Sequence, residues 1–298
     1  MGMLSRVGNI PIIIIPRNMI TFPCAKINLG LNIIEKRTDG YHNLETVFYP
    51  IPLYDVLEIK SMDEHFPSEQ PCDLKTTGNV IDCNESDNLV IKAYQLLSKD
   101  FKIPRVHAHL YKQIPPQAGL GGGSSDAAYM IRLLDERFRL NLGNAEMERY
   151  AAKLGADCAF FITSEPSFAT GIGDCLSPVD TPKGNLKGYY LCIVKPDVAV
   201  STKDAYADIV PHKAEKCCRD IVKQPIETWK NELKNDFELP VFARYPVLKD
   251  IKEELYHNGA VYASMSGSGS AIYGIFQNDP APSLAQDFNA CFFSCMKL

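Results

Sequence analysis

The chain has 298 residues, with 31 lysines and arginines against 36 aspartates and glutamates, and a formal net charge of −5. Its composition, 46% hydrophobic and 22% charged, is that of a globular protein and excludes disorder as the main state. The mildly acidic balance disfavours a general nucleic-acid binder, which needs a basic field, and it equally disfavours electrostatic docking on an anionic membrane.

The first eighteen residues do not fit the rest of the chain. Residues 10–16 form the apolar run Ile-Pro-Ile-Ile-Ile-Ile-Pro, which is far shorter than the ~20 residues of a membrane-spanning helix. Its two prolines and the following Arg17 argue against a cleavable signal peptide. We therefore expect residues 1–18 to be a translated upstream stretch and Met19 to be the natural start.

The first half of the chain is predicted to mix strands and helices. Residues 19–34 form a β-rich opening, and Asp39-Gly40 is a turn signal. Strands of a hairpin or meander are expected at 46–48 and 56–59, a helix at 88–97, a half-buried strand at 106–111, and helices at 124–138 and 146–154.

Beyond Gly155 the expected strands become shorter. We expect strands at 168–170, 189–194, 271–276 and 291–297, and helices at 203–209, 226–233, 247–256 and 283–290. Because strands and helices do not alternate as strict βαβ units, the pattern predicts the α+β class.

The strongest local signal is a Gly-rich stretch between a predicted strand and a predicted helix. It consists of Pro115, Pro116, Gln117, Ala118, Gly119, Leu120, Gly121, Gly122, Gly123, Ser124 and Ser125. Consecutive glycines let backbone N–H groups approach a ligand, and a helix N-terminus favours phosphate. Ser124 or Ser125 would also offer a hydroxyl to a phosphate or to Mg²⁺. An ordinary N-cap is the alternative, but a cap alone does not require the glycines before it, so we predict a phosphate-binding loop.

Other motifs are excluded by inspection. A Walker A loop needs Gly-Lys-Ser/Thr, and no glycine of this chain is followed by lysine. A dinucleotide-binding fingerprint needs a glycine where Ser124 stands. The ten cysteines contain no C-x-x-C pair, so the sequence does not predict a zinc site, and we expect free thiols in a reducing cytosol.

Three further segments complete a larger pattern with the Gly-rich stretch. They are residues 23–31 (PCAKINLGL), 153–161 (KLGADCAFF) and 266–270 (SGSGS). Together the four segments resemble the motifs of the GHMP kinases, the family of galactokinase, homoserine kinase, mevalonate kinase and phosphomevalonate kinase. The resemblance runs from about residue 19 to residue 276.

This resemblance implies a two-domain α+β fold with the active site in the cleft between the domains. After the leader at 1–18, an ATP-binding domain similar to ribosomal protein S5 is expected at 19–165, and a ferredoxin-like substrate domain at 166–298. The implied reaction is transfer of the γ-phosphoryl group of ATP, with Mg²⁺, to an alcohol. The stretch 39–46 (DGYHNLET) resembles those members that phosphorylate the 2-hydroxyl of a cytidyl diphosphate sugar alcohol on the non-mevalonate route to isoprenoid precursors.

Asp157 and Lys26 are the candidate catalytic residues. An acceptor hydroxyl loses its proton as the new bond forms, and a carboxylate can take that proton. The resemblance favours this role for Asp157 over that of a turn or N-cap residue. A lysine in an apolar strand is costly unless it has a partner. As a cation, Lys26 would lower the pKa of Asp157 or of the hydroxyl and stabilise the moving phosphoryl group, whereas the alternative is a snorkelling surface lysine.

The resemblance also implies a set of substrate-binding residues. They are Asn28 near the acceptor hydroxyl and on the same strand face as Lys26, Tyr41 and His42 on the cytosine, Tyr206 on the opposite face of that base with Thr202 nearby, and Gly267, Ser268 and Gly269 on the phosphates of the sugar-alcohol side. Without the resemblance, Tyr41 reads as a surface tyrosine and 266–270 as a flexible loop. The sequence assigns no Mg²⁺ ligand.

Two other functions stay open from the sequence. One is a GHMP kinase for another small alcohol, such as homoserine or a sugar, which would have no base for Tyr41, His42 and Tyr206 to stack on. The other is a non-catalytic nucleotide-binding regulator, which would not need Lys26 and Asp157. We expect a cytoplasmic protein that binds a small-molecule substrate but neither nucleic acid nor membrane, as a monomer or weak homodimer.

Overall fold

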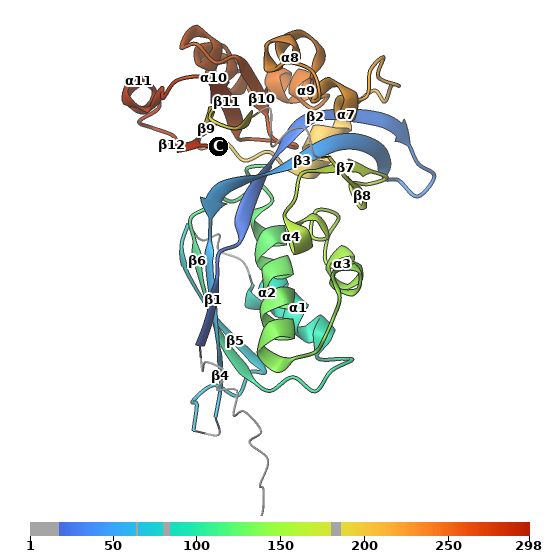
Figure 1. Ribbon diagram of the computed structural model, residues 1–298, viewed down its shortest axis with the longest axis vertical. Coiled ribbons are helices and arrows are strands. Elements are labelled where there is room, and N and C mark those ends of the chain that lie inside the picture. The colour runs from blue at the N-terminus through green and yellow to red at the C-terminus, as the bar shows by residue number, and fades with distance from the viewer. Residues whose placement is uncertain (1–17, 64, 80–83, 180–185) are drawn as a thin grey trace, which may run out of the picture.

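The computed structural model describes residues 18–63, 65–79, 84–179 and 186–298. Three four-stranded sheets and their helices form an α+β fold, which confirms the predicted class (Figure 1). The predicted leader lies outside the described residues except for Asn18, which begins the first strand.

The first sheet and four helices form one half of the molecule, the lower half in Figure 1. The strand order is β1 (Asn18–Thr21), β4 (Val56–Ser61), β6 (Val106–Lys112) and β5 (Cys72–Gly78), with only β5 and β6 parallel. A short 3₁₀ turn (Glu85–Asp87) precedes α1 (Leu89–Leu97), and α2 (Gly122–Phe138), α3 (Asn144–Ala152) and α4 (Phe160–Thr163) follow. In β6, alternate residues are buried, as the sequence pattern predicted.

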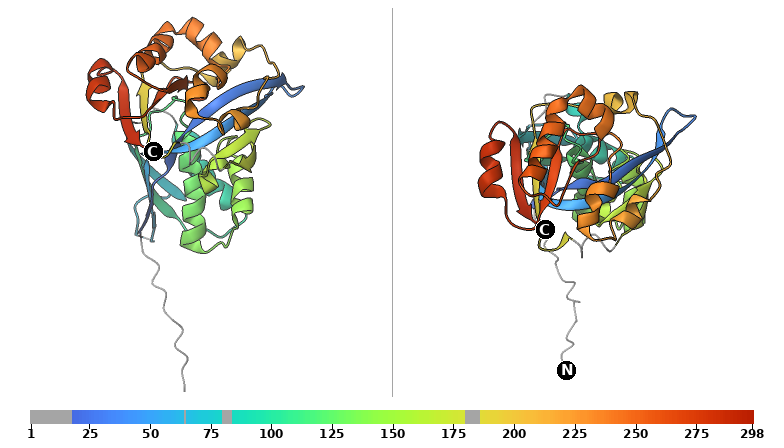
Figure 2. Two further views of the ribbon diagram at one scale, coloured as in Figure 1. Left: turned by 45° about the horizontal axis from the view of Figure 1, so that its top comes forward. Right: turned by 90° about the horizontal axis from the view of Figure 1, so that it is seen from above.

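The second sheet is built on a long hairpin that links the two halves. Its strand order is β2 (Cys24–Lys36), β3 (His42–Tyr54), β7 (Ser167–Thr170) and β8 (Cys175–Pro178), and all neighbours are antiparallel. The tip of the β2–β3 hairpin projects beyond the neighbouring helices (Figure 2). Strand β2 is buried at every position from Cys24 through Leu31, because other elements cover both of its faces.

The predicted hairpin between 46–48 and 56–59 is wrong. The two strands lie in different sheets, with β3 paired to β2 and β7 and with β4 paired to β1 and β6. Asp55 separates them, and its fully buried carboxylate accepts hydrogen bonds from the N–H groups of Gln113 and Ile114. This anchor holds the chain where it crosses from one sheet to the other.

The third sheet forms the other half together with short helices. The strand order is β10 (Tyr262–Met265), β11 (Ile272–Phe276), β9 (Tyr190–Lys195) and β12 (Phe292–Lys297), all antiparallel. The helices are α6 (Thr202–Ala207), α7 (Cys218–Ile221), α8 (Ile226–Glu232), α9 (Glu238–Arg244), α10 (Pro246–His257) and α11 (Ala281–Asp287). They cluster in the upper half of Figure 1.

Most other predicted elements are confirmed, but several short ones were missed. The missed elements are β5, β8, β10, α4, α7 and α9. Helix α9 carries Pro240 near its start, where a helix tolerates proline although the residue usually signals a break. Elements of four to seven residues show too few periods of hydrophobicity to stand out in a sequence.

A shared core joins the two halves. Ile27 and Leu29 of β2 belong to one hydrophobic cluster with Trp229 of α8 and Tyr262 of β10, and all four side chains are fully or almost fully buried. Strand β7, which follows the expected boundary between 165 and 166, pairs with β3. The division into domains at that residue stays a prediction. No helix in the described part of the chain is long and apolar enough to cross a membrane.

Candidate active site

A cleft of about 530 Å³ lies where β2, the Gly-rich loop and the loop between β10 and β11 meet. Eleven of the predicted site residues line it: Lys26, Asn28, Gln117, Gly119, Gly121, Asp157, Thr202, Tyr206, Gly267, Ser268 and Gly269. These residues come from positions scattered between 26 and 269, so the fold brings together most of what the sequence analysis selected. Pro115, Pro116, Ala118, Leu120, Gly122, Gly123, Ser124, Ser125, Tyr41 and His42 are not among its lining residues.

Lys26 and Asp157 form the charged centre of the cleft. Lys26 Nζ lies 3.4 Å from Asp157 Oδ2, and the lysine is 3% exposed whereas the aspartate side chain is 32% exposed. Burial lowers the pKa of Lys26, and the carboxylate of Asp157 opposes this shift. The lysine is therefore fixed in the wall, while the carboxylate remains accessible to a molecule in the cleft.

Three further contacts hold the ammonium group of Lys26. It donates to Asn28 Oδ1 (2.6 Å) and to the carbonyl oxygen of Gly119 (2.9 Å), and it lies 5.2 Å from the centre of the Phe48 ring. Residues two apart on a strand point to the same face, which is why Lys26 and Asn28 meet as the sequence predicted. The lysine thus joins the strand β2 to the Gly-rich loop.

Asn28 is itself oriented by a residue that the sequence analysis did not select. Its Nδ2 donates to Thr46 Oγ1 (2.9 Å), and Thr46 donates in turn to the carbonyl oxygen of Gly30. Tyr273 donates its hydroxyl to the backbone carbonyl of Asn28 (2.7 Å). Because both amide groups of Asn28 have partners inside the protein, the direction of its side chain is fixed before any ligand binds.

The Gly-rich loop can adopt its path only with glycine at its centre. Gly119 has a φ of +72°, and a Cβ atom there would lie 1.9 Å from the carbonyl oxygen of Ser266. Gly121 also has a φ of +72° and stands at the N-cap of α2. The loop therefore packs directly against the segment 266–270 with no side chain between them.

Helix α2 begins two residues earlier than predicted, and this changes the position of the serines. The helix starts at Gly122, and the first N–H bonded within the helix is that of Ser125, which donates to Gly121 O. The alternative of an ordinary serine N-cap does not hold, because Gly121 occupies the N-cap position and no side chain caps the helix. The N–H groups of Gly122, Gly123 and Ser124 precede the first intrahelical bond and are available to an anion.

The two serines of the loop have different surroundings. The hydroxyl of Ser125 is fully buried and has no hydrogen-bond partner within the protein. Ser124 instead hydrogen-bonds to the thiol of Cys158, and burial raises the pKa of that thiol to about 11. A buried orphan hydroxyl at a helix start is a group that an oxygen-seeking cation or a phosphate would satisfy.

The segment 266–270 is joined to the Gly-rich loop by several hydrogen bonds. Ser266 Oγ donates to Gly119 O (2.9 Å), and the N–H of Ala271 donates to Ala118 O (3.1 Å). Gly119 O therefore accepts from both Ser266 and Lys26. The two loops form one continuous wall of the cleft.

A second buried lysine lies behind the Gly-rich loop and was not predicted. Lys112 at the end of β6 pairs with Asp55 and with Asp126 Oδ2 (2.5 Å), and both carboxylates are almost completely buried. Burial alone would lower the pKa of Lys112, but Asp126 and Asp55 outweigh it and raise that pKa. Burial raises the pKa of Asp126 to about 7, against the opposing effect of Lys112. The only sequence signal was a lysine closing an apolar alternation.

Of the predicted base-binding residues, His42 and Tyr206 contact each other beside the cleft, but they do not form a sandwich. The rings of His42 and Tyr206 stack on each other, with centroids 4.8 Å apart and an interplanar angle of 19°. This contact leaves no room for a base between them. Tyr41 is 61% exposed, and its ring stands free at the hairpin tip. Phe237, which no sequence signal indicated, packs edge-on against Tyr206 at 4.8 Å and lines the cleft.

Burial controls the charge state of these aromatic residues. It lowers the pKa of His42, with Lys36 adding to the effect, so the imidazole is neutral near pH 7. It raises the pKa of Tyr206 to about 12, with Asp157 contributing in the same direction. The pocket therefore presents neutral rings, which suits a neutral base better than a charged group.

A cluster of two cysteines and a glutamate lies outside the cleft. The ligand-type atoms of Glu45, Cys217 and Cys218 lie within 4.8 Å of one another, a grouping that only the fold creates. The thiol of Cys217 hydrogen-bonds to Cys218 and to Glu45, and Glu45 also accepts from Asn32 (2.9 Å). Because these groups already satisfy one another, the cluster needs no ion to account for its geometry.

The comparisons with known proteins agree with this geometry. The family model for the N-terminal domain of the GHMP kinases matches residues 88–165, and that for their C-terminal domain matches residues 218–294. A 4-diphosphocytidyl-2-C-methyl-D-erythritol kinase of Bacteroides fragilis is 55% identical over 275 residues, which are 92% of this chain and 97% of that protein. A protein of the same name from Porphyromonas gingivalis is 45% identical over 265 residues, covering 88% of this chain and 93% of that protein.

Solved structures are also similar. A crystal structure of 4-(cytidine 5'-diphospho)-2C-methyl-D-erythritol kinase has a TM-score of 0.78 and 28% sequence identity, and it covers 93% of this chain and 98% of that chain. The mevalonate kinase of Methanococcus jannaschii has a TM-score of 0.68 over 95% of this chain and 100% of that chain, but its 14% identity speaks for the fold alone.

Proposed function

The chain belongs to the GHMP kinases, and we propose that it transfers the γ-phosphoryl group of ATP to the 2-hydroxyl of 4-diphosphocytidyl-2-C-methyl-D-erythritol. Relatives that carry this name are 45–56% identical over most of the chain. The reaction is a step of the non-mevalonate route to isoprenoid precursors. The observation that carries the proposal is the Lys26–Asp157 pair, set in a cleft with a Gly-rich helix start on one side and an aromatic pocket on the other.

In the proposed reaction Asp157 is the general base. As the acceptor oxygen forms its bond to the γ-phosphorus, the bond from that phosphorus to the bridging β-oxygen breaks, and ADP leaves. The hydroxyl proton passes to a carboxylate oxygen of Asp157, whose side chain is one-third exposed to the cleft. Lys26 lies 3.4 Å from this carboxylate, and as a cation it stabilises negative charge on the transferring group. Asn28, fixed by Thr46, would orient the acceptor hydroxyl.

On the ATP side, we propose that the loop 115–125 holds the phosphates. Support comes from the N–H groups at the start of α2 and from the positive end of the 17-residue helix. The loop also offers an oxygen ligand to Mg²⁺, because the hydroxyl of Ser125 has no hydrogen-bond partner within the protein. Bound with ATP, Mg²⁺ would supply positive charge to the phosphate oxygens.

On the acceptor side, we propose that the cytosine takes the face of Tyr206 that His42 now covers. The base would then lie between Tyr206 and Tyr41, and the neutral imidazole of His42 would bind its edge with one donor and one acceptor nitrogen. Thr202 lines the same end of the cleft, and Gly267, Ser268 and Gly269 line it nearer the Gly-rich loop. Backbone groups of these three residues would bind the diphosphate.

An ATP-consumption assay across candidate acceptors tests this function. The cytidyl diphosphate substrate should support turnover, whereas homoserine, mevalonate and galactose should not. A calorimetric titration with CMP, which carries the base and a single phosphate, should show binding below millimolar concentrations. Turnover with another small alcohol, together with no CMP binding, would favour the alternative of a GHMP kinase with a different acceptor. ATP binding without turnover of any acceptor would favour a regulator.

We further propose that the protein works in the cytoplasm as a monomer or weak homodimer on small molecules alone. Eight cysteines in the described part of the chain form no disulfide, which suits a reducing compartment: Cys24, Cys158, Cys175, Cys192, Cys217, Cys218, Cys291 and Cys295. Light scattering over a range of protein concentrations would measure the oligomeric state.

A further inference from the structure

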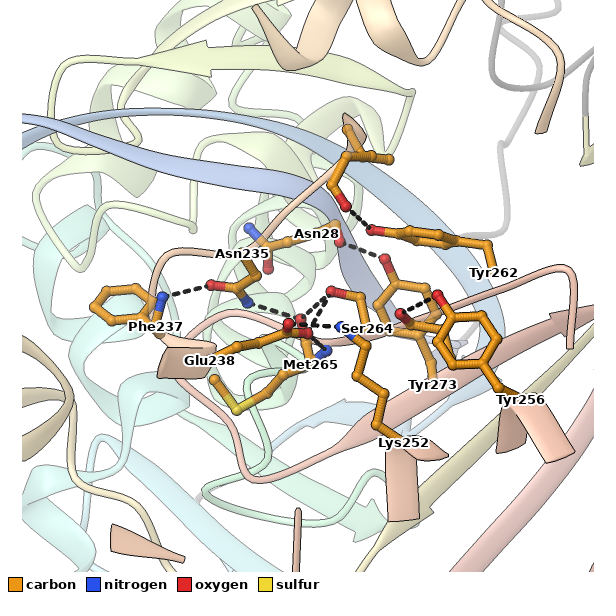
Figure 3. A network of polar contacts seen from close by, with 12 residues as sticks. Asn28, Asn235, Phe237, Glu238, Lys252, Tyr256, Tyr262, Ser264, Met265 and Tyr273 are labelled. Atoms are coloured by element: carbon orange, nitrogen blue, oxygen red, sulfur yellow. Dashed lines mark hydrogen bonds and ion pairs between the residues drawn. The ribbon is translucent and has the colours of Figure 1, made fainter. Parts of the chain in front are cut away.

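We propose that Asn235 is a positioning residue that couples two parts of the substrate site. One is the segment 266–270, called here the diphosphate loop, and the other is the base pocket around His42 and Tyr206. Asn235 lies between α8 and α9, is 4% exposed, and does not line the cleft. Its side chain touches both the segment 266–270 and the backbone of Phe237 (Figure 3). The inference rests on the proposed function, because it concerns binding of the cytidyl diphosphate substrate.

Every hydrogen-bonding group of the Asn235 side chain is used. Its Nδ2 donates to the carbonyl oxygens of Met265 and Gly267, both at 2.8 Å, and its Oδ1 accepts from the N–H of Phe237 at 3.0 Å. A buried amide with three partners has one orientation only. The side chain therefore fixes the distance between the start of the diphosphate loop and the start of α9.

The loop side of this contact reaches the catalytic strand. A Cβ atom on Gly267 would lie 3.4 Å from Asn28 Oδ1 and 3.3 Å from Gly119 O, so the loop backbone is in contact with both. Glu238 supports the same loop from the other side, since it accepts from the N–H of Met265 (2.9 Å) and pairs with Lys252 (2.6 Å) (Figure 3). Asn235 and Glu238 together bind the C=O and the N–H of Met265.

The other side of the contact reaches the base pocket. The Phe237 ring packs edge-on against Tyr206, and Tyr206 stacks on His42. Asn235 fixes the backbone of Phe237. The ring of Phe237 in turn fixes the plane of the Tyr206 ring. A single buried amide thus connects the group that would stack on the base with the group that would bind the diphosphate.

The segment around Asn235 is also anchored to β2. The N–H of Leu31 donates to Lys234 O (2.8 Å), and the N–H of Asp236 donates to Leu31 O (2.9 Å). The side chain of Asp236 accepts from the N–H of Ile33 (2.7 Å). Because β2 also carries Lys26 and Asn28, the anchor gives Asn235 a fixed position relative to the reacting groups.

The substitution Asn235→Asp tests the inference. It keeps the shape and the Oδ1 acceptor, but it removes both donors and turns a carboxylate toward two carbonyl oxygens. We expect CMP to bind about tenfold more weakly and the KM for the cytidyl diphosphate substrate to rise about tenfold, since buried acceptors lose their donor. The KM for ATP should stay within about twofold, because the N–H groups at the start of α2 do not depend on Asn235.

Asn258→Asp is the matched control. Asn258 Nδ2 also donates two hydrogen bonds, to Glu254 O and Glu254 Oε1, at the end of α10 and outside the cleft. This variant should keep all three constants within about twofold of the wild type. If Asn235→Asp does not yield folded protein, Asn235→Ser, which keeps one donor and adds no charge, takes its place with a smaller change in the same direction.

A double variant tests whether Asn235 and Phe237 act on CMP binding through the same contact or through a general loss of packing. Phe237→Leu alone should weaken CMP binding, and adding Asn235→Asp should weaken it by less than the product of the two single effects, because both act through the ring. Unchanged CMP affinity and substrate KM in folded Asn235→Asp, or equal rises in both KM values, would overturn the inference. Failure of the wild type to bind CMP would instead refute the proposed function.

Discussion

Two buried lysines of this molecule are paired with carboxylates, but only one pair can do chemistry on a ligand. Lys112 lies between Asp55 and Asp126, which are almost completely buried. Lys26 faces Asp157, whose side chain is one-third exposed in the cleft. A closed network holds its own charges in place, whereas the open pair offers a carboxylate to a ligand. Exposure of the carboxylate, rather than burial of the lysine, separates an active-site group from a structural one.

The buried network of Lys112, Asp55 and Asp126 supports the site that holds Lys26 and Asp157. Lys112 ends β6, Asp126 lies in the first turns of α2, and the Gly-rich loop runs between these elements. Asp55 also accepts from the N–H groups of Gln113 and Ile114, at the entry to the loop. The chain thus fixes both ends of the loop with buried charges, and the loop's own N–H groups take no part in this network.

The largest effect should come from Asp157→Asn. Phosphoryl transfer should fall by about a hundredfold to ten-thousandfold, because the amide cannot accept the hydroxyl proton. ATP affinity and thermal stability should change little, since the side chain is partly solvated. Steady-state kinetics and ATP titration measure both. Asp73→Asn is the matched control, because Asp73 is 31% exposed and pairs with His107 at 2.6 Å far from the cleft. Full activity in Asp157→Asn would refute its role as base.

Lys112→Met, unlike Asp157→Asn, should lower the stability of the fold. Removing the cation leaves two carboxylates buried without a partner, so the free energy of unfolding should fall by about 3–5 kcal/mol. Denaturant titration measures this change. Lys216→Met breaks the exposed pair with Glu232 (2.8 Å) and should cost less than about 1 kcal/mol. Equal losses in the two variants would show that the closed network contributes no more than a surface ion pair.

A third expected effect is a change in pH dependence. The pKa of Asp126 is about 7 in the folded protein against 3.8 for the free side chain, so between these values the folded state binds more protons. Stability contributed by this group should therefore be present below about pH 4 and be lost as the pH rises toward 7, by up to about 1.4 kcal/mol per pH unit. Asp126→Asn should remove this component.

Unfolding free energies measured from pH 5 to pH 8 test this prediction. The difference between the wild type and Asp126→Asn should slope with pH. Parallel profiles for wild type and Asp126→Asn would contradict the raised pKa.

Local patterns made part of the site predictable. Lys26 and Asn28 lie on one face because side chains alternate between the two faces of a strand. The Gly-rich stretch predicted a loop before a helix. Asn235 and Phe237 gave no such signal, because their importance comes from partners far away in the chain. The contact between His42 and Tyr206 was likewise hidden, since it depends on how the start of β3 lies against α6.

The sequence by itself determined the class of the protein, the Gly-rich loop before a helix and the residues of the charged centre. It also excluded a basic field, so a chain with a net charge of −5 must hold two polyanions by local groups. Only the tertiary structure decided which carboxylate stays open to the cleft, which lysine is enclosed, and which amide joins the two substrate-binding regions. The physical reason is that burial and hydrogen-bond partnership are properties of neighbours in space, and residues such as Asn28, Asn235 and Gly267 become neighbours only when the chain folds.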